Sequence, residues 1–163
     1  MPASPATPDG EVLLTTTEPI DLVLSLTPLA HGRGDPTIRL ARGEVWRATR
    51  TVDGPAAVHL RSAPGGIAVR AWGPGAAWAV ANAGDLAGLN DDPRALMPRH
   101  AVVAELARRF AGLRLPRSNA PFEALLPAIC EQKITGAEAR RVYRSIVRRY
   151  GEPGPGPGGL WLA

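Results

Sequence analysis

The alternation of apolar and polar positions predicts a series of short strands in the first half of the chain. Every second residue between Ile20 and Thr27 is apolar, which is typical of a strand with one buried face. Gly- and Pro-containing turns at 53–55 and 64–66 predict tight hairpins. A short alanine-rich helix is predicted over 74–83. The predicted strands cover residues 20–27, 37–40, 43–50, 56–62 and 66–72.

Apolar residues recur at helical spacing in the second half. A helix with one apolar face is predicted over residues 99–110. Two further helices are predicted within residues 118–150, joined by a short turn at 132–136. Ser118 or Asn119 is suited to cap the first of these two helices. The chain therefore predicts an α+β fold, with a small antiparallel sheet followed by helices.

The second helix of the pair is predicted to open on a capping box. Thr135 and Glu138 have the spacing at which each side chain can bond the other's backbone amide. Arg140, Arg144 and Arg148 follow at intervals of four residues, so they form one stripe along the helix. A basic helix surface thus lies next to the turn.

Four parts are predicted along the chain. Residues 1–17, rich in Pro, Ser and Thr, are expected to be a mostly disordered lead-in. Residues 18–92 form the antiparallel α+β domain, and residues 93–151 form the helical part. Residues 152–163 are expected to be a flexible Gly/Pro-rich tail, whose apolar last four residues resemble the start of a further segment.

Positive charge is concentrated in the helical part. Residues 99–150 contain 11 Arg or Lys against 4 Asp or Glu, whereas residues 1–98 contain 8 against 10. The balances are therefore +7 and −2, and Glu152 completes the net charge of +4. This asymmetry suggests a polyanionic partner, although on charge alone a solvated arginine-rich helix surface is the favoured explanation, because helices are often rich in arginine.

Several classes of site and location are disfavoured by the composition. Cys130 is the single cysteine, which excludes an internal disulfide and a cysteine-rich zinc site. His31, His59 and His100 are too far apart for metal-ligand spacing, so neither a metal nor a cofactor is expected. No signal peptide or membrane-spanning run is recognisable, so a cytoplasmic location is expected.

Two segments could approach a ligand. In the 28–36 loop, His31 and Arg33 stand beside glycines, but such a loop is more often a turn, and no catalytic constellation supports an enzyme site there. At the 132–136 turn, a helix N-terminus attracts phosphate, Lys133 adds charge and Gln132 can bond a base edge. The simpler alternative is a helical corner closed by its own cap, with Lys133 in solvent.

The residues around this turn resemble the helix-hairpin-helix DNA glycosylases, in particular the bacterial 3-methyladenine glycosylase II group. The matching runs cover most strongly residues 112–116, 122–124, 128–135 and 148–152. The resemblance implies an antiparallel N-terminal α+β domain ahead of a helical domain. It also implies that a damaged, alkylated base is flipped out of duplex DNA and its glycosidic bond hydrolysed, without a metal.

The resemblance assigns the DNA-binding face to this turn. The residues it implies are Gln132, Lys133, Thr135, Gly136 and Arg140. Lys133 falls where the family places an apolar wedge that fills the gap left by the flipped base, so a lysine there departs from the pattern. Double-stranded DNA is the expected partner, bound weakly, with a nucleoid-associated location.

The family's DNA-gripping hairpin and catalytic Asp follow the region matched here. None of the carboxylates present matches the catalytic position, so the chain is expected to be a catalytically incomplete fragment. Apolar faces of 99–110 and 136–150 should then be exposed, and a protein partner or a missing segment should complete the core. The alternative is a non-enzymatic nucleic-acid-binding or protein-interaction module that uses the basic helix 136–150.

Overall fold

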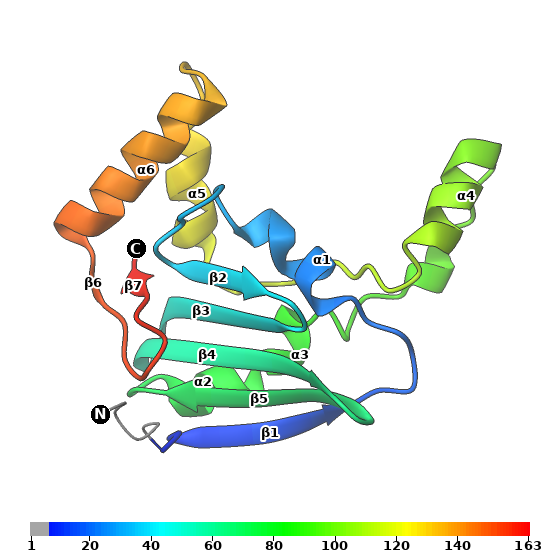
Figure 1. The fold of residues 1–163 in the computed structure, drawn as a ribbon, viewed down its shortest axis with the longest axis horizontal. Coiled ribbons are helices and arrows are strands. Elements are labelled where there is room, and N and C mark those ends of the chain that lie inside the picture. Colours follow the sequence, from blue (N-terminus) through cyan, green and yellow to red (C-terminus); the bar gives the residue numbers. More distant parts are fainter. Residues whose placement is uncertain (1–6) are drawn as a thin grey trace.

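The computed structural model describes residues 7–163, and a five-stranded antiparallel sheet lies at its centre (Figure 1). The strand order is β1-β5-β4-β3-β2, so the last four strands form a meander and the first joins at its far edge. Hairpins join β3 to β4 and β4 to β5, as the turns predicted. The strands are β1 (Gly10–Thr15), β2 (Ile38–Ala41), β3 (Glu44–Thr51), β4 (Gly54–Ala63) and β5 (Gly66–Trp72).

Helices lie mainly on one face of this sheet and beyond one of its edges (Figure 1). The predicted α+β class is confirmed. The α-helices are α1 (Leu22–Leu26), α2 (Ala76–Ala81), α3 (Ala83–Leu86), α4 (Ala101–Arg109), α5 (Pro121–Cys130) and α6 (Gly136–Tyr150). The remaining elements are two short 3₁₀ helices, η1 (Thr27–Leu29) and η2 (Pro93–Ala95), and a paired strand couple, β6 (Glu152–Pro153) and β7 (Trp161–Leu162).

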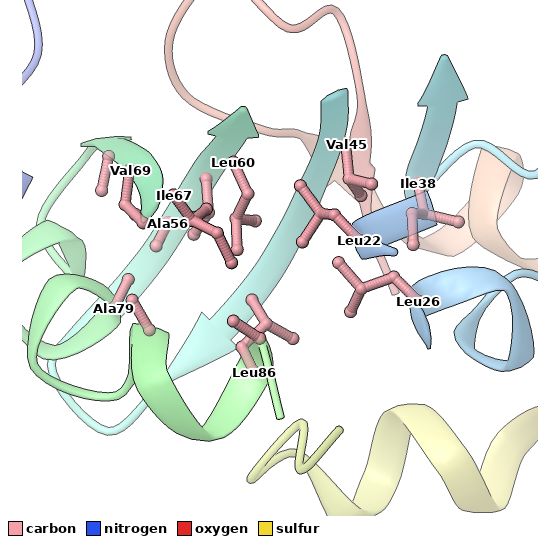
Figure 2. Packing of buried hydrophobic residues seen from close by; sticks show 14 of the residues in the cluster. Leu22, Leu26, Ile38, Val45, Ala56, Leu60, Ile67, Val69, Ala79 and Leu86 are labelled. Atoms are coloured by element: carbon pink, nitrogen blue, oxygen red, sulfur yellow. The ribbon is translucent and has the colours of Figure 1, made fainter. Parts of the chain in front are cut away.

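The main core lies between the sheet and helices α1, α2 and α3. Alternate residues of β3, β4 and β5 point to this face, among them Val45, Leu60 and Val69, all fully buried (Figure 2). Leu22 and Leu26 of α1 pack against them. Each aliphatic side chain buried in this way stabilises the fold by about 1.5–3 kcal/mol.

Leu22–Leu26 forms helix α1, so the strand predicted over 20–27 is wrong. The Asp21 carboxylate caps α1 by accepting a hydrogen bond from the Leu24 amide at 2.9 Å. Leu22, Ser25 and Leu26 are buried, which is the spacing of one helix face. Leucines at alternate positions fit the period of a strand and, in part, also the period of a helix. The Asp21 cap together with packing against the sheet favours the helix.

The edge position of the sheet is taken by a segment that was expected to be disordered. Residues Gly10–Thr15 form β1, whose six residues pair antiparallel with β5. Val12 and Leu14 pack against the main core. The prediction of a disordered lead-in over 1–17 is therefore wrong for β1, while residues 1–6 lie outside the described residues. A short run without a helical period is compatible with an edge strand, which needs only one pairing partner.

Residues 152–163 pack against the second face of the sheet, which corrects the prediction of a flexible tail. Leu160 and Leu162 are buried against Ala48 and Trp46. The amide of Trp161 donates to the Pro36 carbonyl at 2.8 Å, which ties the tail to the loop before β2. The apolar end of the chain is thus part of a second, smaller core.

A glycine in the tail permits its close approach to the sheet. Gly156 has φ +69, and a Cβ at this position would lie 2.6 Å from Cγ of Trp72. Trp72 stacks against Trp46, with ring centroids 5.4 Å apart. Only a residue without a side chain can adopt this backbone conformation against the indole without strain.

The apolar face of α4 is exposed, as expected. Helix α4 stands apart from the sheet (Figure 1), and Val102, Leu106 and Phe110 are all solvent-exposed. The corresponding expectation for residues 136–150 holds only in part. Val142 and Tyr150 are exposed, but α6 buries the side chains that face the sheet domain: Ala139, Tyr143 and Val147.

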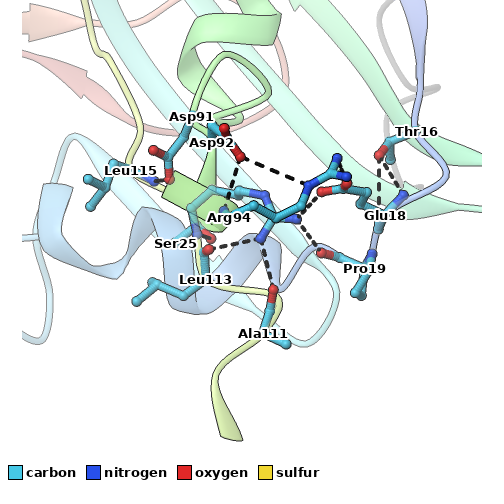
Figure 3. Close-up of polar contacts among 11 residues, drawn as sticks. Thr16, Glu18, Pro19, Ser25, Asp91, Asp92, Arg94, Ala111, Leu113 and Leu115 are labelled. Carbon is cyan, nitrogen blue, oxygen red and sulfur yellow. Dashed lines mark hydrogen bonds and ion pairs between the residues drawn. The ribbon is translucent and has the colours of Figure 1, made fainter. Parts of the chain in front are cut away.

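Arg114 holds the connection between α4 and α5 against the first helix. Its buried guanidinium donates to the carbonyls of Ala111, Leu113 and Pro19 at 2.9–3.0 Å and pairs with Glu18 at 3.2 Å (Figure 3). Its amide donates to the Ser25 hydroxyl at 2.9 Å. This arginine belongs to a run that resembles the glycosylases, and its role in this structure is to fix the chain path.

Glu123 of α5 is bound to strand β3, next to the edge strand β2, by three hydrogen bonds. Its carboxylate accepts from the Arg47 guanidinium at 2.6 Å, the Thr49 hydroxyl at 2.7 Å and the Arg50 amide at 3.0 Å. The side chains of Arg47 and Glu123 are only 6% and 12% exposed. A charge-assisted contact of this kind fixes both the position and the rotation of α5 relative to the sheet.

Replacing Glu123 with alanine should lower the free energy of unfolding by about 3 kcal/mol, because the buried Arg47 charge loses its partner. Urea unfolding of Glu123→Ala measures this loss. The matched control is Glu152→Ala, which breaks the half-exposed ion pair with Arg50 and should cost less than about 1 kcal/mol. Equal losses in the two variants would contradict the special role of Glu123.

Candidate nucleic-acid interface

The turn between α5 and α6 forms the tip of a helical hairpin that projects away from the sheet (Figure 1). Gln132, Lys133, Thr135 and Gly136 are all exposed there. Within residues 7–163, the side chains of Gln132 and Lys133 form no ion pair or hydrogen bond with the protein. Four of the five predicted DNA-binding residues are therefore adjacent and accessible.

The predicted capping box is present at the start of α6. The Thr135 hydroxyl accepts from the Glu138 amide at 3.4 Å, and the Glu138 carboxylate accepts from the Thr135 amide at 3.1 Å and its hydroxyl at 2.8 Å. These bonds lower the pKa of Glu138, first through the Thr135 side chain and then through its amide. The cap therefore holds a carboxylate at the helix N-terminus, where the positive end of the helix dipole favours it.

Arg140, the fifth predicted residue, is positioned by the loop before β2. Its side chain lies directly over Gly32, whose φ of +86 and lack of a Cβ make room for it. One turn later, Arg144 donates to the Arg33 carbonyl at 3.2 Å. The arginine stripe is therefore partly a docking surface for the 28–36 loop, and Arg140 contributes charge from the side of the helix below the tip.

Tyr143 anchors α6 to the same loop. It is 2% exposed, its hydroxyl lies 3.4 Å from that of Thr37, and its ring meets His31 edge-on with centroids 5.0 Å apart. Burial raises the pKa of Tyr143 to about 12, and the nearby carboxylates of Asp35 and Glu123 add to the shift. The phenol therefore remains neutral at any physiological pH.

Helix α5 begins at a different residue from the one predicted. Its N-cap is Ala120, which makes no side-chain capping bond, and Pro121 occupies its first turn. Asn119 has φ +51 and donates its amide hydrogens to Asp85 and Asn82 instead. The asparagine is therefore used to join the start of α5 to α3, so neither Ser118 nor Asn119 serves as the cap.

The other residues that could bind a metal ion or act as a nucleophile do not form a cluster within residues 7–163. No group of three or more His, Cys, Asp or Glu side chains within residues 7–163 is arranged to hold a metal ion. Cys130 is half-buried near the end of α5. No helix in the described part of the chain has the length and apolar character needed to cross a bilayer.

The sequence reasoning missed the residues that hold the turn in place. Glu123 lies in a run that resembles the glycosylases, but its contact with Arg47 spans 76 residues of chain, and no local pattern signals it. The 28–36 loop is a possible ligand loop in the sequence, and in the structure its Gly32 makes room for Arg140 while Arg144 lies beside Gly34. The glycines beside Arg33 were the available signal, because they permit close approach of another element.

The fold is similar to that of a 3-methyladenine DNA glycosylase from Archaeoglobus fulgidus, with a TM-score of 0.68 and 20% sequence identity. The similarity covers 94% of this chain and 54% of that chain, so this chain spans about half the length of its structural neighbour. At this identity the likeness establishes a shared fold. No protein-family model matches the sequence, and no curated protein matches it significantly.

The cap should make the stability of α6 depend on pH. Since the folded state lowers the pKa of Glu138 below its ordinary 4.5, the contribution of the cap is complete above that value and is lost as the pH falls through the lowered pKa. Thermal unfolding followed by far-ultraviolet circular dichroism should therefore show a smaller difference between the wild type and Glu138→Gln in acid. The control Glu131→Gln, outside the cap, should keep the wild-type pH dependence. An unchanged pH dependence in Glu138→Gln would contradict this role.

Proposed function

We propose that this chain binds double-stranded DNA through the exposed α5–α6 turn. The observation that supports this proposal is the turn itself, which presents Lys133 and Gln132, unpartnered within residues 7–163, at the tip of a hairpin anchored to the sheet by Glu123 and Tyr143. A long helix with its N-terminus at the tip adds a favourable potential for phosphate. The basic charge on α6 extends this potential along the helix.

Each turn residue has a defined part in this proposal. Lys133 inserts its aliphatic stem beside the bases and directs its ammonium group to a phosphate. Gln132 bonds a base edge, and the first amides of α6, beginning at Gly136, face the backbone phosphates, since no intrahelical acceptor is available to them. Arg140 supplies charge from the side, because its stem lies over Gly32.

We further propose that the intact protein to which this fold belongs removes alkylated bases by hydrolysing the N-glycosidic bond, as a base-excision-repair glycosylase in the nucleoid. The chain described here would bind DNA without that chemistry. Two of its carboxylates near the hairpin are already committed, Glu123 to β3 and Glu138 to the helix cap.

Lys133→Ala should weaken binding to a duplex oligonucleotide about tenfold at low salt and reduce the slope of log affinity against log salt by about one, because one phosphate contact is lost. Fluorescence anisotropy over a salt series measures both quantities. Lys133→Met keeps the stem without the charge and should retain part of the affinity if the stem enters the duplex. Arg42→Ala, on the exposed β2–β3 turn, is the control and should bind as the wild type does.

A salt slope near zero for the wild type would contradict the proposed phosphate contacts. Incubation of the purified chain with duplex DNA containing alkylated purines separates binding from chemistry. Release of free base above background would contradict the proposal that this chain binds without hydrolysis.

A second candidate function is protein interaction, which the exposed apolar side chains favour. Helix α5 presents Phe122, Leu125 and Ile129 to solvent at 54–62% exposure, and α4 exposes a further apolar face. We propose that further polypeptide, in the same chain or in a partner protein, covers these faces. Contiguous apolar surface of this kind typically marks an interaction site, and the greater length of the structural neighbour is consistent with such a covering segment.

Leu125→Glu should reduce both self-association and the binding of an apolar fluorescent dye, because it places a charge in the middle of the exposed face. Light scattering and dye fluorescence measure the two effects. The matched control is Val52→Glu, which changes an isolated valine that is 85% exposed in a hairpin turn. Equal effects of the two substitutions would contradict a specific apolar binding surface on α5.

A further inference from the structure

We propose that a groove between the 28–36 loop, β2 and the C-terminal end of α6 binds a phosphate-type anion. The groove has a volume of about 550 Å³, and three arginines from three separate segments line it: Arg33, Arg39 and Arg148. Asp35 of the loop and Leu160 of the tail also line it. This site lies apart from the turn that we propose for DNA.

The three arginines of this groove outnumber its one carboxylate, so its lining keeps a net positive charge. Asp35 is the acidic residue in its lining, and its carboxylate already accepts three hydrogen bonds: from the His31 amide at 2.7 Å and from the Thr37 amide and hydroxyl at 2.8 Å. These bonds shape the loop. None of the three guanidinium groups forms an ion pair with a carboxylate anywhere in residues 7–163.

Two of the arginines are oriented by aromatic rings. The Arg39 guanidinium lies 5.5 Å from the centre of the Trp46 ring and donates to the Gly158 carbonyl at 2.9 Å. The Arg148 guanidinium lies 5.2 Å from the centre of the Trp161 ring. A cation–π contact fixes the direction of a guanidinium while leaving its charge and most of its N–H donors available.

The loop that carries Arg33 is fixed as well. Arg144 donates to the Arg33 carbonyl at 3.2 Å, and the Asp35 bonds hold the residues that follow. Arg33, Arg39 and Arg148 thus line one hollow, and the contacts above hold the segments that carry them. Planar guanidinium forks match the oxygen spacing of phosphate, so the chemistry of this groove favours a phosphate or pyrophosphate group.

The groove and the turn are separate surfaces. Arg148 follows Gly136 by twelve residues, which places it about 18 Å along the helix axis from the start of α6. The ligand phosphate could belong to a free small molecule or to a nucleic-acid strand. The volume of the groove suits a small phosphorylated ligand as well as a single backbone phosphate.

The test is titration of the full chain with sodium pyrophosphate at low ionic strength, followed by calorimetry. We expect saturable binding that Arg148→Ala weakens about tenfold, in proportion to the loss of one or two charge-assisted hydrogen bonds. Arg33→Ala, in an exposed loop, should weaken it similarly, and Arg148→Lys should weaken it less than alanine does. Circular dichroism confirms that each variant is folded.

Arg149→Ala is the matched control, because it removes the same charge from the next position of the same helix, outside the groove. It should bind pyrophosphate within about twofold of the wild type, since long-range charge effects are modest. Absence of saturable binding, or equal weakening by Arg148→Ala and Arg149→Ala, would overturn the proposal and indicate only a diffuse basic surface.

A second arm identifies the source of the phosphate. If the groove takes nucleic-acid phosphate, Arg148→Ala will weaken duplex binding more than Arg149→Ala, and pyrophosphate will compete with DNA. If it takes a free ligand, duplex affinity will be the same in both variants while pyrophosphate binding differs. Because the first arm uses no DNA, loss of DNA binding at the turn would leave the result for the groove unaffected.

Discussion

The contact between Glu123 and Arg47 determines where α5, the first helix of the hairpin, lies on the sheet. Helix α5 directs its larger apolar side chains to solvent, so apolar packing alone does not fix it on the sheet. Its carboxylate instead binds the guanidinium, hydroxyl and amide offered by three residues of β3. A buried ion pair is costly to desolvate, and in this protein its value is the single orientation that its hydrogen bonds permit. The turn at the tip of the hairpin inherits that orientation.

Helix α6 is held in a different way, through close packing with the loop before β2. Tyr143 and Val147 are buried, and the glycines of the loop allow Arg140 and Arg144 to lie across it. Helix α5 is therefore fixed by a polar contact, and helix α6 is fixed by complementary packing against the loop. Two dissimilar attachments resist rotation of the hairpin as a unit, which leaves the turn exposed and yet well positioned for a ligand.

Arginine serves several physical purposes in this chain, and its frequency reveals none of them. Arg114 satisfies backbone carbonyls in a buried connection, and Arg47 holds a helix. Arg144 caps a carbonyl of the loop, whereas Arg39 and Arg148 are directed by tryptophan rings. The uneven charge along the sequence thus combines structural arginines with those that remain available to an anion.

Local patterns in the sequence were sufficient for the hairpin strands β3, β4 and β5, the helices α2 and α4, and the capping box of α6. Each depends on residues close together in the chain, such as the turn glycines or the pair Thr135 and Glu138. The resemblance in the 112–152 region likewise located the exposed turn. Alternate leucines over 20–27 fitted two periods, and the Asp21 cap together with packing against the sheet made that segment a helix.

Tertiary structure alone decided the remainder. The edge strand Gly10–Thr15 exists because β5 offers it a pairing partner, and the apolar tail is ordered because Ala48 and the tryptophans of the second sheet face receive it. The arginine groove brings Arg148 of α6 next to Arg33 and Arg39, more than a hundred residues earlier in the chain. Contacts between segments far apart in the chain form only once the chain has folded. The sequence by itself specifies which chemical groups are present, but it does not specify which of them come within contact distance.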